Sequence, residues 1–130
     1  MRKVIPLATY TYTLLVIAAS LMKLVITFMP QGVSNGDKYG HAIAYFGFTI
    51  IWSLYFYVRN KEYSKKIFFN GVFRAAIFGV LFGMLMEVAQ LVLTSYRQFD
   101  FKDALANSTG VLLAKPLLYF FSNFFMLIKK

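Results

Sequence analysis

The chain has 130 residues, about the length of one domain. Hydrophobic residues make up 59% of it and charged residues only 15%, against about 25% charged residues in an average soluble chain. So little polar surface cannot cover a water-soluble globule of this size, so we do not expect a soluble enzyme. We do not expect a disordered chain either, because disordered chains have low hydrophobicity. The formal net charge of +9 would suit nucleic acid, but in so apolar a chain it favours anionic lipid instead.

Four apolar stretches are each long enough to cross the hydrocarbon of a bilayer, which takes about 20 residues of helix. In chain order they cover residues 4–29, 41–58, 72–95 and 104–128. The first follows two basic residues, as a secretory signal does, but it is longer than a signal core and is expected to stay as a helix. We therefore predict an all-α, polytopic membrane protein whose single domain, residues 1–130, is a bundle of four transmembrane helices.

Lysine and arginine are distributed unevenly between the two ends of this predicted bundle. Nine lie before the first stretch, around the turn between the second and third, or after the fourth, whereas three lie in the other two turns. Cytoplasmic loops of membrane proteins carry an excess of these residues. Both termini and the middle turn are therefore predicted to be cytoplasmic, and the first and third turns to face outward.

Polar residues that are rare in membrane helices gather toward this predicted outer face, and of five acidic residues only Glu62 lies on the opposite side. The group consists of Asp37, Lys38, His41 and Tyr45 in and before the second stretch, Glu87 and Gln90 in the third, and Arg97, Asp100, Asp103 and Asn107 around the start of the fourth. Spacings of three and four residues would place many of them on common helix faces.

Glu87 is the strongest functional candidate in this group, because a carboxyl group inside a span is costly unless it is paired, neutral or beside a polar cavity. Structural pairing with Arg97 or Lys23 is the alternative. Asp37 and Asp103 could take part in chemistry or could merely cap helix N-termini. The carboxylates of Asp37, Glu87, Asp100 and Asp103 could in principle hold a magnesium or calcium ion. No close acidic pair or His-rich spacing supports this, so no metal is predicted, and the sequence identifies no cofactor. His41, the only histidine, could carry protons or form a structural hydrogen bond.

The arrangement resembles the VanZ-like family, named for a teicoplanin-resistance membrane protein. The resemblance covers about residues 36–114 and rests on Asp37-Lys38-Tyr39-Gly40-His41 with Tyr45, on Gly83, Glu87 and Gln90, and on Arg97-Gln98-Phe99-Asp100-Phe101-Lys102-Asp103 with Asn107 and Gly110. It implies a small, multi-pass protein of the bacterial cell membrane. It also implies a link to resistance against teicoplanin, a glycopeptide that acts at the outer surface on cell-wall precursors.

Three functions fit these residues, and whether the protein is an enzyme stays open at this point. The first is a membrane enzyme acting on an envelope lipid or a lipid-linked wall precursor, with catalytic candidates Glu87, Asp103, His41 and Asp37 and binding candidates Lys38, Tyr45, Gln90, Arg97, Asp100 and Asn107. The second is a non-catalytic protein that binds glycopeptide, lipid or a wall-synthesis partner. The third, a small proton-coupled transporter, is less favoured because its acidic residues should lie near the bilayer midplane.

Overall fold

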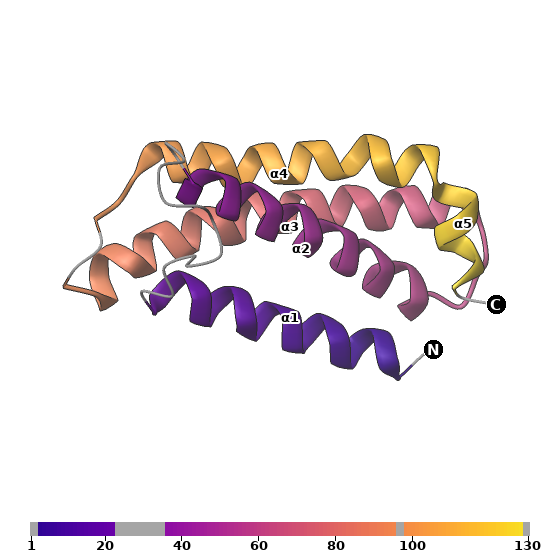
Figure 1. Ribbon diagram of the computed structural model, residues 1–130. Coiled ribbons are helices and arrows are strands. Elements are labelled where there is room, and N and C mark those ends of the chain that lie inside the picture. The colour runs from indigo at the N-terminus through magenta and orange to yellow at the C-terminus, as the bar shows by residue number, and fades with distance from the viewer. Residues whose placement is uncertain (1–2, 23–35, 96–97, 129–130) are drawn as a thin grey trace.

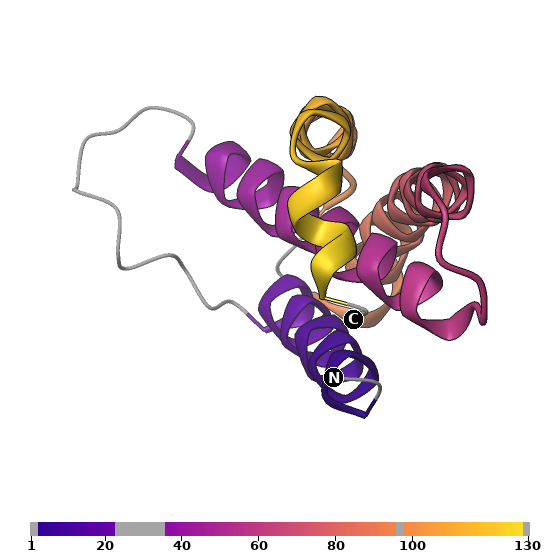
Figure 2. The same ribbon diagram turned by 90° about the vertical axis from the view of Figure 1, so that its right-hand side faces the viewer.

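The computed structural model describes residues 3–22, 36–95 and 98–128, and every regular element within them is a helix. The helices are α1 (Val4–Leu21), α2 (Gly36–Arg59), α3 (Lys65–Leu93), α4 (Phe101–Phe120) and the short α5 (Ser122–Leu127). Successive long helices run in opposite directions, and α5 turns away from the end of α4 (Figure 1). In the view along the bundle, α4, α3 and α1 lie around α2, which packs against all three (Figure 2). The predicted all-α class is confirmed.

The observed helices differ from the predicted spans mainly at their ends. α2 begins at Gly36 instead of residue 41, and α3 begins at Lys65 instead of residue 72. At the start of α3 the hydroxyl of Ser64 accepts a hydrogen bond from the Ile67 backbone N–H at 3.2 Å, which caps the helix beyond its apolar stretch. α1 ends at Leu21, and most of the predicted extension to residue 29 lies outside the described residues.

Three helices, α1, α2 and α3, are long and apolar enough to cross a membrane, whereas four spans were predicted. α4 is not among the three, because its 20 residues include the polar run from Lys102 to Thr109 and, further on, Lys115. The structure therefore supports a membrane protein with three candidate spans and a fourth, shorter helix of more mixed composition.

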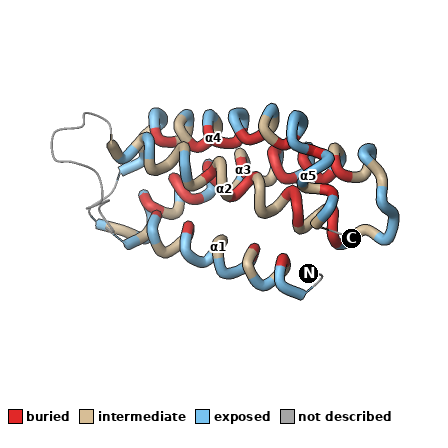
Figure 3. Tube along the Cα trace, turned by 45° about the vertical axis from the view of Figure 1, so that its right-hand side comes forward, coloured by how far each residue is buried: buried red, intermediate tan, exposed pale blue. Residues whose placement is uncertain are grey.

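Small residues allow the central helices to approach one another closely. A Cβ atom added at Gly110 of α4 would overlap the backbone carbonyl of Ala42 in α2. Glycine at this contact therefore lets the two backbones touch, as small residues do between membrane helices. Buried residues line the inner sides of the helices and exposed residues their outer sides (Figure 3). Many of the exposed side chains are large and apolar, which suits contact with lipid tails.

The antiparallel order gives the bundle two chemically different ends. We call one the polar end, where α1 and α3 finish and α2 and α4 begin; its residues are Ser20, Asp37, Lys38, His41, Tyr45, Glu87, Gln90, Asp100, Lys102, Asp103 and Asn107. We call the other the basic end, with the exposed residues Lys3, Arg59, Lys61, Lys65 and Lys66. The described members of the polar group that was predicted to lie toward the outer membrane face are thus found at one end of the helices.

Candidate functional site

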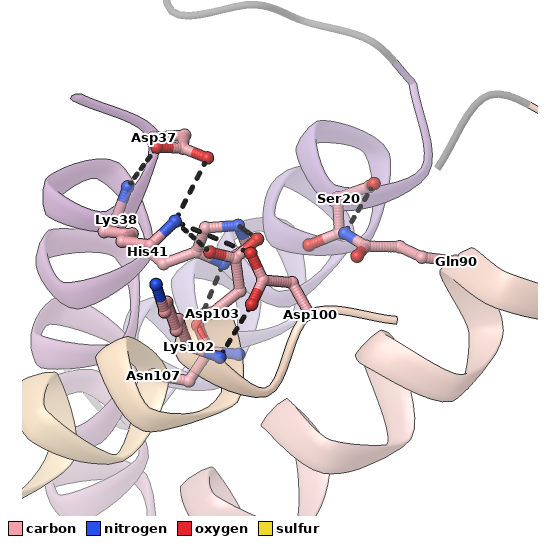
Figure 4. A network of polar contacts seen from close by, with 9 residues as sticks. All are labelled: Ser20, Asp37, Lys38, His41, Gln90, Asp100, Lys102, Asp103 and Asn107. Atoms are coloured by element: carbon pink, nitrogen blue, oxygen red, sulfur yellow. Dashed lines mark hydrogen bonds and ion pairs between the residues drawn. The ribbon is translucent and has the colours of Figure 1, made fainter. Parts of the chain in front are cut away.

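Lys38 connects the first turn of α2 to the start of α4 (Figure 4). Its Nζ atom lies 3.3 Å from Oδ1 of Asp103, 3.6 Å from Oδ2 of Asp100 and 3.7 Å from Oδ2 of Asp37. Asp100 caps α4, accepting a hydrogen bond from the Lys102 backbone N–H at 2.8 Å. This bond, together with the charge of Lys38, lowers the pKa of Asp100 below its ordinary value. The network holds two helix N-termini beside each other with the Lys38 ammonium between their carboxylates.

His41 uses its two ring nitrogens on two different residues of α4. Nδ1 lies 2.9 Å from Oδ1 of Asn107, and Nε2 lies 3.6 Å from Oδ2 of Asp103. An amide oxygen can only accept a hydrogen bond, so Nδ1 carries a proton and donates it to Asn107. The separation on the other side is too long for a direct hydrogen bond. The Nε2 atom is therefore held facing a carboxylate with a gap between them.

Glu87 is fully buried in α3, and neither of its carboxylate oxygens has a hydrogen-bond partner among the described residues. The Asp100 backbone N–H and the His41 ring face it, without a hydrogen bond of ordinary geometry. One ligand-type atom each of Glu87, His41 and Asp103 lies within 4.8 Å of the others. Three helices thus bring three ionisable groups to one point.

Three further buried atoms beside this point lack hydrogen-bond partners within the described part of the chain: the Tyr45 hydroxyl, Nδ2 of Asn107 and Oδ1 of Asp103. The Asp103 atom has only its ion pair with Lys38. A Cβ added at Gly83, one turn before Glu87, would lie 3.0 Å from Cβ of Asn107 and 3.2 Å from Cε1 of Tyr45. Glycine at this position therefore leaves room for both side chains. Buried polar groups without partners cost about 1–3 kcal/mol each and are rare in proteins. Their concentration at one place indicates a site that is completed by a group outside the described residues.

The family model described as VanZ/LLP1 matches residues 5–123. The chain belongs to the VanZ/LLP1 family. This confirms the resemblance seen in the sequence and extends it from about residues 36–114 to nearly the whole chain. No curated protein and no solved structure matched the chain.

Not all of the predicted site residues of this VanZ/LLP1 protein meet at Glu87. Asp37 is well exposed, and its described contacts are with Lys38 alone. Gln90 is buried, and its Nε2 atom donates to the carbonyl of Ser20 at 2.9 Å (Figure 4). Gln90 therefore fastens α3 to the last turn of α1. Arg97 lies outside the described residues.

Two contacts of this VanZ/LLP1 site could not be found from spacing along the chain. Ser20 was not singled out, because a serine late in an apolar stretch has no distinguishing signal. The bond between His41 and Asn107 joins residues 66 positions apart, whereas spacing rules describe neighbours on a single helix. The predicted group was informative about which end of the bundle carries the site, and the structure adds which members touch.

Proposed function

We propose that this VanZ/LLP1 protein works in the cell membrane of a bacterium, where its polar end acts on an envelope lipid or a lipid-linked cell-wall precursor. In this role it would lower susceptibility to a glycopeptide of the teicoplanin type or maintain the envelope. The observation that carries the proposal is the buried carboxylate of Glu87, unpartnered among the described residues, beside His41 and Asp103. An acid held in this state in a membrane helix is costly, which is the usual mark of a functional group.

The proposed placement has four spans, with α4 as the fourth. α4 is less apolar than the other long helices, but its outward side exposes large hydrophobic residues that suit lipid: Phe101, Leu105, Leu112, Leu113 and Phe120. Five exposed lysine and arginine residues mark the basic end, against Lys38 and Lys102 among the described residues of the polar end. This difference supports a cytoplasmic basic end and a polar end at the outer leaflet.

The proposed chemistry divides the work among the three helices. The Glu87 carboxylate has free lone pairs and would accept a proton from a substrate hydroxyl or attack the substrate directly. The unbonded Nε2 side of His41, oriented through Asn107, would receive or return a proton beside Asp103. Lys38, partly exposed, would contact a phosphate or carboxylate of the headgroup.

The test is glycopeptide susceptibility in a sensitive host that expresses either the wild type or Glu87→Gln at matched membrane levels. The amide keeps the shape of the side chain but cannot act as a base, and loss of such a group usually costs about 10²–10⁴-fold in rate. We expect the wild type to protect against teicoplanin and the variant not to protect. Glu62→Gln, an exposed acid at the basic end, is the matched control and should protect fully. Equal protection by wild type and Glu87→Gln would contradict the acid–base role.

A second candidate function is binding without catalysis. It is favoured by the Tyr45 hydroxyl and Nδ2 of Asn107, which can only hold a ligand by hydrogen bonds in this setting. Such a protein would bind the glycopeptide, a lipid or a partner in wall synthesis and limit drug access. It would tolerate Glu87→Gln and lose protection gradually with each substitution around the site. Lipid extracts from the two strains separate the candidates further, because only the enzyme predicts a modified envelope lipid.

A further inference from the structure

The spacing of His41, Glu87 and Asp103 is close to what a bound metal ion requires. Ligands at about 2.1 Å from a tetrahedral ion lie about 3.4 Å from one another. Nε2 of His41 and Oδ2 of Asp103 are 3.6 Å apart. One ligand-type atom of each of the three residues lies within 4.8 Å of the other two. A small movement of the Glu87 side chain would therefore complete three bonds to one ion.

The possible metal-binding atoms at this point are short of hydrogen-bond partners among the described residues. Nδ1 of His41 donates to Asn107, so in the neutral ring Nε2 presents a lone pair to the Asp103 carboxylate. Glu87 adds two buried carboxylate oxygens without a hydrogen-bond partner among the described residues. Lone pairs that face one another in a buried place repel, and a cation between them removes the repulsion.

The residues that hold two of the three donors, His41 and Asp103, are those expected of a metal site. Histidines that bind a metal generally donate their other N–H to an oxygen, as His41 does to Asn107. The other oxygen of Asp103 lies 3.3 Å from Nζ of Lys38, which orients the carboxylate and leaves Oδ2 free. His41 and Asp103 are therefore already oriented by neighbouring side chains.

The charge around the site favours a cation. The described residues of the polar end include four carboxylic acids and two lysines, and Lys38 alone is shared among three of the carboxylates. A divalent cation would neutralise this excess of negative charge. One imidazole and two carboxylates are ligands typical of zinc and manganese, since magnesium and calcium prefer oxygen alone.

We propose that His41, Glu87 and Asp103 bind one divalent transition-metal ion of the zinc or manganese class at the polar end of the bundle. Three protein ligands leave a coordination position open, which is typical of catalytic sites. The ion would use it to polarise a phosphoryl or carbonyl oxygen of the substrate. This deepens the proposed function by naming what activates the lipid headgroup, and in that respect it rests on the proposed function. Metal binding itself requires no substrate.

The test is calorimetric titration of the full chain, purified in detergent and stripped with a chelator, with ZnCl2 and separately with MnCl2. We expect one ion per chain and a higher Tm with the ion bound, because a ligand that binds only the folded state stabilises it. Asn107→Ala removes the hydrogen bond that orients the His41 ring and should weaken binding by about 10–100-fold. Glu87→Gln and Asp103→Asn remove ligands and should weaken it at least as much.

Glu62→Gln is the control, because Glu62 is an exposed acid at the basic end and lies outside the trio. It should bind the ion as the wild type does. The proposal is overturned if the wild type binds no ion. That result is expected if a protonated His41 pairs with Asp103 in place of a metal ion. The proposal is also overturned if Glu87→Gln and Asp103→Asn bind the ion as tightly as the wild type does. Circular dichroism of each variant shows whether its helices are intact, and Asn107→Ala gives a second route where a ligand variant fails to fold.

The outcomes separate this proposal from the proposed function. Protection that depends on Glu87, in a protein that binds neither ion, would keep the function and remove the metal. Stoichiometric binding in a protein that neither protects its host nor changes an envelope lipid would keep the metal and remove the function.

Discussion

The two ends of the bundle are built from the same helices but have different interiors. At the basic end, apolar side chains fill the space between the helices, including Leu54, Tyr57, Phe68, Val72 and Leu118, while the lysines and arginines stay exposed. At the polar end the interior contains an acid, an imidazole and an amide whose hydrogen-bonding capacity is only partly used. We therefore expect the polar end to be less stable than the same end would be with an apolar interior.

The largest expected effect comes from moving the carboxylate to the basic end. Val72 is fully buried there, and Val72→Glu would place an acid in an interior that offers no partners. We expect a loss of more than about 3 kcal/mol in the free energy of unfolding, enough to prevent folding. Val72→Met is the control, because methionine is similar in length to glutamate but carries no charge. The measurement is unfolding in a detergent mixture, and a stably folded Val72→Glu would show that the two interiors do not differ in this respect.

The converse change makes the polar end resemble the basic end. Glu87→Met removes a buried acid that has no hydrogen-bond partner among the described residues and keeps its length. We expect the free energy of unfolding to rise by about 1–3 kcal/mol in the presence of a chelator, while protection against teicoplanin is lost. A loss of stability instead would mean that Glu87 supports the fold, which is the structural alternative weighed from the sequence.

The smallest effect concerns pH and Asp100. The Lys102 backbone N–H, and then Lys38, lower the pKa of this exposed carboxyl from its ordinary value of 3.8. Because the folded-state pKa is the lower one, its stabilising effect is complete above the ordinary value and is lost as the pH falls through the lowered value. Asp100→Asn should therefore make Tm less sensitive to acid below about pH 4 and leave the slope near neutrality unchanged. If Tm depends on acid pH in the variant as it does in the wild type, the contacts of Asp100 with the Lys102 backbone N–H and with Lys38 do not stabilise the fold.

Much of the fold followed from the lengths of the apolar stretches, and its errors have local causes. α2 starts earlier than its apolar stretch because polar residues such as Asp37 and Lys38 are stable in a first helical turn, where a carboxylate meets the helix dipole. α3 starts earlier because Ser64 caps it. Hydropathy does not register either effect. The fourth stretch was predicted as a span because residues 104–128 are mostly apolar. α4 is not among the three candidates, because it begins among polar residues and ends at Phe120.

The candidate site was predictable as a group but not as a set of contacts. Acidic residues concentrated on one side of the predicted membrane indicated where to look, and Glu87 was singled out by the cost of an acid in a span. Periodicity gives neighbours within a helix and says nothing about which turn of α4 faces His41. Asp103 and Asn107 are its partners because of how far α4 is shifted along α2. The close contact between Gly110 and the α2 backbone sets this shift.

The distribution of the trio over three helices also determines when the protein becomes competent during its synthesis. The ribosome completes α2 with His41 first, then α3 with Glu87, and α4 with Asp103 and Asn107 last. Until α4 docks, the nascent chain contains a histidine without its orienting amide and an acid without its neighbouring carboxylate. Docking of α4 is thus the step that brings the three residues together, and a chain interrupted before α4 would lack Asp103 and Asn107.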